Sequence, residues 1–178
     1  DGNISQDRLE DCINSDLANN FGNLCQRVSA FTIKNCDSKI PEKIQFLNED
    51  LKILDEYNKN LDNLRLEIDN QNINYYIDYI INRLFEANKY FNDQEPWKKK
   101  NDIIRLNTIV FTTLEIVRKI TFLLYPIIPH SCLKALEIFN LKENDIIFET
   151  IRNNDFLKKG SSIKKIDILF SKIEQEND

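Results

Sequence analysis

Glycine, proline and histidine are scarce in this chain of 178 residues, which contains only 3 Gly, 4 Pro and one His. So few turn-forming residues argue against a many-turned β-sandwich or barrel and favour long helices. The single histidine, His130, cannot complete a zinc site with cysteines that show no metal-binding spacing, so we predict no metal site. The rest of the composition, with 42% hydrophobic and 30% charged residues, is typical of one globular domain.

Long hydrophobic runs and targeting segments are also missing. The apolar run from Ile120 to Ile128 is too short to span a bilayer and is interrupted by Pro126. We interpret the cysteines as free thiols of a reducing compartment; they are Cys12, Cys25, Cys36 and Cys132. These features predict a cytoplasmic protein with no membrane partner. The chain also begins at Asp1 without a start methionine, so we expect it to be a piece of a longer polypeptide.

The charge balance and the missing catalytic motifs limit the possible functions. A formal net charge of −5 argues against a protein that holds nucleic acid mainly through its phosphates, although a small local site could still read a few bases. We find no carboxylate pair, no nucleophile–base pair and no glycine-rich phosphate loop, so we predict no catalytic residue in this chain.

Apolar residues recur every three or four positions over most of the chain, which is the spacing of amphipathic helices. The segments with this spacing are 7–33, 48–68 with a possible break at 58–60, 72–91, 102–124 and 131–139. Ser131 stands where it could cap the last of these helices. We therefore predict an all-α fold, a bundle of about five helices over residues 1–140.

Residues 141–178 lack this regular pattern, so we predict an irregular C-terminal extension. The apolar residues from Ile163 to Ile173 are more numerous than a free tail should expose. We expect this stretch to be poorly packed within the chain and to dock on a partner that the chain does not contain.

The first predicted helix carries polar residues beside its apolar stripe. At about 100° per residue, Asp16, Asn20, Asn23 and Arg27 fall on one flank. Asn23 and Arg27 are one helical turn apart, so an amide and a guanidinium lie side by side and could reach several acceptors on the edge of a base. The alternative interpretation is a solvated flank beside a core stripe.

Trp97, the only tryptophan, lies in a connection between helices, after Pro96 and before Lys98 to Lys100. Such a ring could cap the end of the bundle. It could equally serve as a stacking platform for an unpaired base, because every base has a face.

Two segments resemble a known family, the helical anticodon-binding domain of the methionyl-tRNA synthetases, which are class I aminoacyl-tRNA synthetases. Residues 14–27 read NSDLANNFGNLCQR, and residues 87–97 read ANKYFNDQEPW. Their order and spacing match the family across almost the whole chain. The resemblance implies an anticodon-binding helix bundle.

Carried over by position, the resemblance implies that Asn23, Arg27 and Trp97 read the methionine anticodon CAU. Trp97 would stack under the first anticodon base, and the other two side chains would bond to its edge. Pro96 would set the position of the tryptophan. Asn20 and Lys98 complete the candidate set, with Lys98 limited to a phosphate contact.

The resemblance also implies a longer enzyme, a methionine–tRNA ligase that uses ATP. Its His-Ile-Gly-His-type and Lys-Met-Ser-Lys-Ser-type signatures do not occur here, so we expect this chain to be inactive alone and to bind no cofactor. The implied partners are the anticodon loop of tRNA(Met) and the catalytic domain of the same polypeptide, on which residues 141–178 would pack. Two alternatives stay open: the equivalent domain of another class I synthetase, and a non-enzymatic helical scaffold for protein partners.

Overall fold

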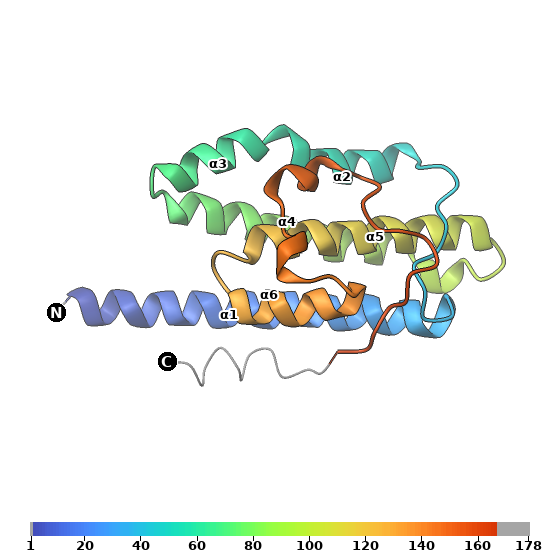
Figure 1. Ribbon diagram of the computed structural model, residues 1–178, viewed down its shortest axis with the longest axis horizontal. Coiled ribbons are helices and arrows are strands. Elements are labelled where there is room, and N and C mark those ends of the chain that lie inside the picture. The colour runs from blue at the N-terminus through green and yellow to red at the C-terminus, as the bar shows by residue number, and fades with distance from the viewer. Residues whose placement is uncertain (1, 167–178) are drawn as a thin grey trace.

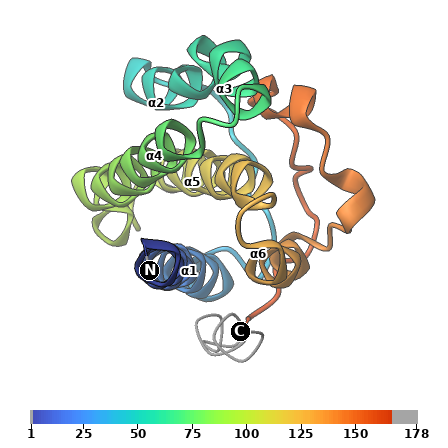
Figure 2. The same cartoon turned by 90° about the vertical axis from the view of Figure 1, so that its left-hand side faces the viewer.

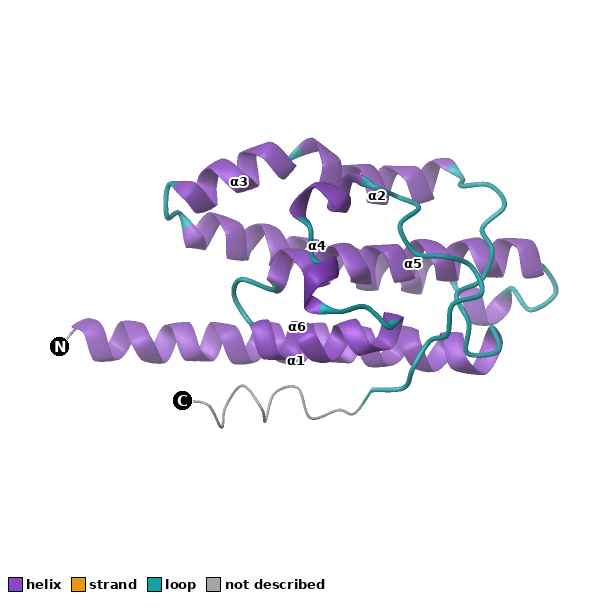
Figure 3. Cartoon of the chain, in the orientation of Figure 1, coloured by secondary structure: helices purple, strands orange, loops and turns teal. Residues whose placement is uncertain are grey.

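The computed structural model describes residues 2–166, with side chains from residue 15 onward, and over this range the chain is helical with no strand (Figure 3). This confirms the all-α prediction. The α-helices are α1 (Gly2–Asn35), α2 (Asn48–Lys59), α3 (Leu61–Asp69), α4 (Ile73–Gln94), α5 (Ile103–Leu124) and α6 (Pro129–Leu136). Short 3-10 turns follow: η1 (Pro96–Lys98) between α4 and α5, then η2 (Glu137–Phe139), η3 (Glu143–Asp145) and η4 (Phe148–Arg152). The predicted break at 58–60 is confirmed, because Asn60 separates α2 from α3.

Helix α5 is the centre of the bundle. Every residue from Thr108 to Leu124 is buried, and α1, α2, α4 and α6 all pack against it (Figure 2). A helix buried all round must satisfy its polar side chains internally. Its threonines do so, since the hydroxyls of Thr112, Thr113 and Thr121 donate to carbonyls one turn earlier at 2.7–2.8 Å. None of the described helices combines the length and apolarity needed to cross a membrane.

The prediction that Ser131 caps a helix is wrong. Helix α6 begins at Pro129, its N-cap residue is Ile128, and Ser131 lies buried inside the helix. Proline suits the first helical position because its backbone angle is already helical and it has no N–H to leave unpaired.

The expectation of a poorly packed C-terminal stretch is wrong for its described part. Ile163 and Ile166 are only 3% and 4% exposed, and they belong to the same core as α5. The backbone N–H of Ile163 donates to Ser38 at 2.7 Å, and the N–H of Ile40 donates to Ser161 at 2.8 Å. Backbone pairing with the loop after α1 therefore buries this segment without any helical periodicity. Leu169, Phe170 and Ile173 lie outside the described residues, so their docking on a catalytic domain stays a prediction.

Buried charges on α5 hold the segment from Thr150 to Leu157. Glu115, Arg118 and Lys119 are fully buried. Arg118 pairs with Glu115 at 2.6 Å and donates to the carbonyls of Thr150 and Asn153 at 3.0 and 2.6 Å. The second Glu115 oxygen accepts from the N–H of Leu157 at 2.6 Å. These bonds satisfy both the buried charges and the polar backbone of a segment that has no regular structure.

Candidate nucleic-acid interface

The connection between α4 and α5 presents Trp97 at one end of the bundle. Glu95 ends α4 in the left-handed region (φ 47°, ψ 57°), which is unusual for a residue other than glycine. Pro96 and Trp97 then begin η1, in which the N–H of Lys98 donates to Glu95 at 2.9 Å. Pro96 is buried and Trp97 is 40% exposed, so the proline anchors a turn that leaves part of the indole in solvent.

The indole rests on a row of aromatic rings. The Trp97 and Phe91 centroids are 5.9 Å apart with planes inclined at 62°, and Phe91 meets Phe31 of α1 edge-to-face at 5.6 Å. Such edge-to-face pairs are worth about 0.5–1.5 kcal/mol beyond their buried area. Trp97 therefore does pack on the bundle end, as the alternative interpretation held, but the packing leaves part of its surface free.

Arg27 lies beside this row and joins α1 to the turn. Its guanidinium carbon is 4.7 Å from the Phe91 centroid and 5.8 Å from the Trp97 centroid, both within the range of a cation–π contact. It also donates to the side-chain oxygen of Asn92. A guanidinium has five N–H donors, so the bond to Asn92 leaves others for a ligand. Residues 70 positions apart in the sequence thus meet at one site.

The other candidates surround this pair. Asn20 and Asn23 are exposed on α1, at the spacing that places them on the same flank as Arg27. Lys98 is exposed and pairs with Glu95, so part of its charge is already neutralised. The structure therefore brings Arg27 and Trp97 into contact, with Asn20 and Asn23 exposed on the same flank of α1 and Lys98 next to Trp97 in the turn.

Two residues next to the site were not in the candidate set. Phe91 supports both Trp97 and Arg27, and Asn92 binds Arg27 directly. Phe91 appears in the sequence as one more member of an apolar stripe, and Asn92 as a residue ending a helix. The sequence signal that could have identified them is their position in the segment 87–97, which also contains Trp97.

Asp50 fixes the ends of the connection that carries Trp97. This fully buried carboxylate accepts from Arg105 at 2.7 and 3.0 Å, from the N–H of Leu47 at 2.8 Å, and from the hydroxyl of Tyr90. Arg105 also donates to Gln94 at 2.7 Å. The hydrogen bond to Asp50 raises the pKa of Arg105, while burial and then that same carboxylate raise the pKa of Tyr90. One carboxylate thereby joins the start of α2, the end of α4 and the start of α5.

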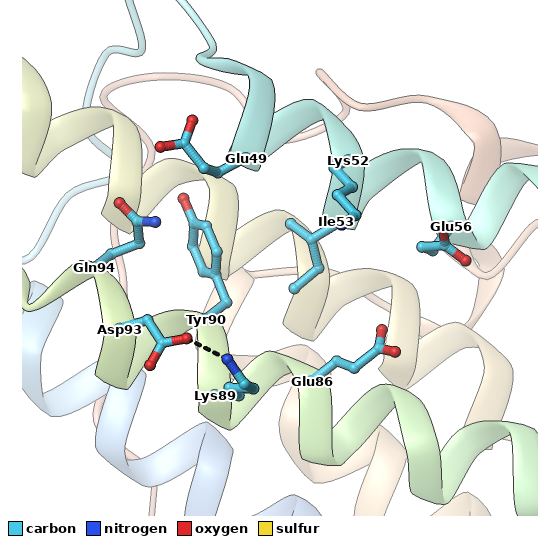
Figure 4. Close-up of a pocket in the computed structure, with 9 residues that line it drawn as sticks. All are labelled: Glu49, Lys52, Ile53, Glu56, Glu86, Lys89, Tyr90, Asp93 and Gln94. Carbon is cyan, nitrogen blue, oxygen red and sulfur yellow. Dashed lines mark hydrogen bonds and ion pairs between the residues drawn. The ribbon is translucent and has the colours of Figure 1, made fainter.

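A pocket between α2 and α4 does not include the candidate residues (Figure 4). Lys89 and Asp93 form an ion pair at its edge at 2.6 Å. Its lining carries more acids than bases, which does not suit a polyanion. The lining residues are Glu49, Lys52, Ile53, Glu56, Glu86, Lys89, Tyr90, Asp93 and Gln94.

Known proteins with similar sequences and structures agree on one family. Residues 40–178 match the sequence model described as the anticodon binding domain of methionyl tRNA ligase. Methionine–tRNA ligase of Rickettsia felis is 35% identical over 98% of this chain and 35% of its own length, and that of Brucella suis is 37% identical over 78% and 27%. The apo structure of Mycobacterium tuberculosis methionyl-tRNA synthetase matches 89% of this chain and 32% of its own, with 31% identity and a TM-score of 0.80.

These matches confirm the resemblance and decide against another class I synthetase. The chain spans about a third of the length of the curated relatives from Rickettsia. Their remaining two-thirds have no counterpart in the 178 residues. The chain belongs to the family of anticodon-binding domains of the methionyl-tRNA ligases.

Proposed function

We propose that this chain binds the anticodon loop of tRNA(Met) and reads the cytosine at the first position of the anticodon CAU. The contact of Arg27 with the partly exposed Trp97 carries the proposal, because it sets hydrogen-bond donors next to a free aromatic surface. Proteins read unpaired RNA in this way, by stacking a base and bonding along its edge.

The donors and acceptors suit cytosine better than uracil. The Watson–Crick edge of cytosine offers acceptors at O2 and N3 and a donor at its amino group. Arg27 can donate to the two acceptors, and the amide oxygen of Asn23 can accept from the amino group. Uracil presents an N–H at position 3, which would face a donor of Arg27 and leave it unpaired.

The larger assembly is also part of the proposal. As a piece of a methionine–tRNA ligase in the cytoplasm, the chain would select the tRNA, while parts of the polypeptide beyond it would use ATP to attach methionine. On this view the chain holds no cofactor or metal of its own. Residues 141–178 would then contribute to the interface with the catalytic domain, through the apolar residues after Ile166.

A titration with anticodon stem-loops tests the proposal. Trp97 is the only tryptophan, so its fluorescence reports directly on a base that stacks against it. A CAU stem-loop should quench this fluorescence and bind more tightly than the same stem-loop carrying UAU. Equal binding of both RNAs, or no binding of either, would overturn the proposal, and no binding is what a helical protein scaffold predicts.

A further inference from the structure

A strip of α4 continues away from the site. Residues Ile81, Phe85, Asn88 and Asn92 are spaced by four, three and four positions, so they lie along one face of the helix. We call these four residues the α4 strip. Phe85 is 69% exposed, the largest fraction among the large apolar side chains that the structure describes, and Ile81 is 44% exposed. An exposed phenylalanine in this position has no role in the core.

The α4 strip runs beside the candidate residues of α1. Helices α1 and α4 pack together and run in the same direction (Figure 1), and Arg27 bonds to Asn92. Phe85 precedes Asn92 by seven residues, just as Asn20 precedes Arg27. Seven residues are two helical turns, or about 10 Å. Phe85 and Asn20 are therefore at the same level of the two helices, two turns from the contact between Arg27 and Asn92.

The spacing fits a further nucleotide of the same loop. Stacked bases repeat at about 3.4 Å along a strand, so about 10 Å is the length of roughly three stacked base steps. Asn88 follows Phe85 by three residues on α4, and Asn20 lies at the same level on α1. The side-chain amides of these two residues can serve as donors and acceptors to RNA. Two exposed apolar side chains are too small a surface for a stable protein interface, which needs about 800 Å² from each partner.

We propose that Phe85 is a second stacking platform, on which another unpaired nucleotide of the anticodon loop rests. The inference rests on the proposed function and extends it along the loop. A phenyl ring has no hydrogen-bonding group and stacks on any base, so Phe85 supplies affinity without choosing the base. Base identity would be read at Arg27, and the Phe85 contact would hold the loop in register.

The test measures binding of a fluorescein-labelled CAU stem-loop by anisotropy, with the whole 178-residue chain. Phe85→Ala should weaken binding by about 5- to 150-fold, the usual effect of losing one aromatic–base stack. Phe85→Trp should preserve binding, whereas Phe85→Leu should lose most of it because leucine is apolar without an aromatic face. Ile147→Ala removes a side chain that is also exposed, at 50%, but lies outside the α4 strip, and it should have no effect.

Stem-loops that lack one base at a time then identify the nucleotide. Phe85→Ala should lose its effect on one of these abasic RNAs, and that RNA should not be the one that lacks the first anticodon base. If Phe85→Leu binds as well as Phe85→Trp, or if no single abasic RNA abolishes the effect, the stacking inference is overturned.

A parallel measurement on Trp97→Ala separates this inference from the proposed function. If Trp97→Ala weakens binding and Phe85→Ala does not, the second platform is wrong and the proposed function stands. If neither variant changes the affinity, the proposed function fails together with the inference.

Discussion

At the scale of single residues, the proposed role of each candidate side chain can be tested with its own substitution. Trp97→Ala should weaken binding of a CAU stem-loop by about 1–3 kcal/mol, because it removes the stacking surface. Arg27→Ala and Asn23→Ala should also narrow the preference for cytosine over uracil, by about 1–3 kcal/mol for each lost edge contact, by analogy with bidentate base contacts in DNA. Affinities for CAU and UAU stem-loops give both quantities.

Melting curves and Lys98→Ala are the controls for these variants. Asn23 and Trp97 are exposed and Arg27 is half-buried, so the folded state should survive each change. Lys98→Ala should have a similar small effect on all anticodons that fades with salt, as expected of a phosphate contact. Folded Trp97 and Arg27 variants that keep the parent's preference would place the reading site elsewhere.

A second residue-scale prediction concerns the buried carboxylate of Asp50. Arg105→Ala should lower the free energy of unfolding by about 3–5 kcal/mol, because it leaves a buried carboxylate without its ionic partner. Urea denaturation measures the loss. Arg65→Ala is a matched control, since Arg65 forms an exposed pair with Glu149 at 2.7 Å and such pairs contribute little. Equal effects of the two variants would contradict the role given to Asp50.

The sequence predicts neighbours within a helix better than neighbours between helices. Asn23 and Arg27 could be paired from their spacing, but nothing in the sequence shows that Arg27 meets Trp97 through Phe91. The buried position of Asp50 was harder still to predict from the sequence. An acid near a helix start usually faces solvent and interacts with the helix dipole, and here it is buried among three helices.

At the scale of elements, apolar periodicity located the α-helices that the structure describes. It could not predict the packing of the segment after α6, which has no such periodicity. Residues 148–157 are held by Glu115, Arg118 and Lys119, which in the sequence are three charged residues in a mostly apolar stretch of α5. Charges there suggest an exposed face. Their burial depends on backbone groups of a distant segment without periodicity. The sequence therefore predicts neither the burial of these charges nor the position of that segment.

Lys119 makes the packing of residues 148–157 on α5 sensitive to pH. Its ammonium donates to Asn154 at 2.6 Å; burial and then Arg118 lower its pKa from the ordinary 10.5 to about 7, against the opposing charges of Glu115 and Asp55. Between about pH 7 and 10.5 the unfolded chain binds a proton that the folded chain has released. The free energy of unfolding should therefore rise with pH in this window, and Lys119→Met should flatten the rise.

Urea denaturation at pH values from about 7 to about 9.5 measures this slope below the range where tyrosines ionise. The difference between parent and variant isolates Lys119 from all other titrating groups. Lys52→Met, which changes an exposed lysine of α2, should leave the slope as it is in the parent. An unchanged slope in Lys119→Met would show that Lys119 keeps its proton in the folded chain.

At the scale of the whole molecule, binding and chemistry are expected to be separate. The chain contains neither of the two nucleotide-site signatures that the resemblance implies for the longer enzyme. We therefore expect purified chain to show no methionine-dependent exchange between ATP and pyrophosphate. The same preparation should still bind the CAU stem-loop, which controls for correct folding. Exchange that persists through purification and follows the protein would show that a catalytic site lies within these 178 residues.

The hydrogen bonds of Asp50 to α4 and α5 also have a consequence for the proposed binding of RNA. One carboxylate holds both ends of the connection that carries Trp97. If Trp97 stacks on a base as proposed, its turn should need little rearrangement on binding. The protein then loses little conformational freedom on binding. On the proposed function, the ordering would fall on the RNA, whose loop would have to open its stack to offer bases. Loops that open easily would bind with less penalty, so the flexibility of an RNA would count beside its anticodon.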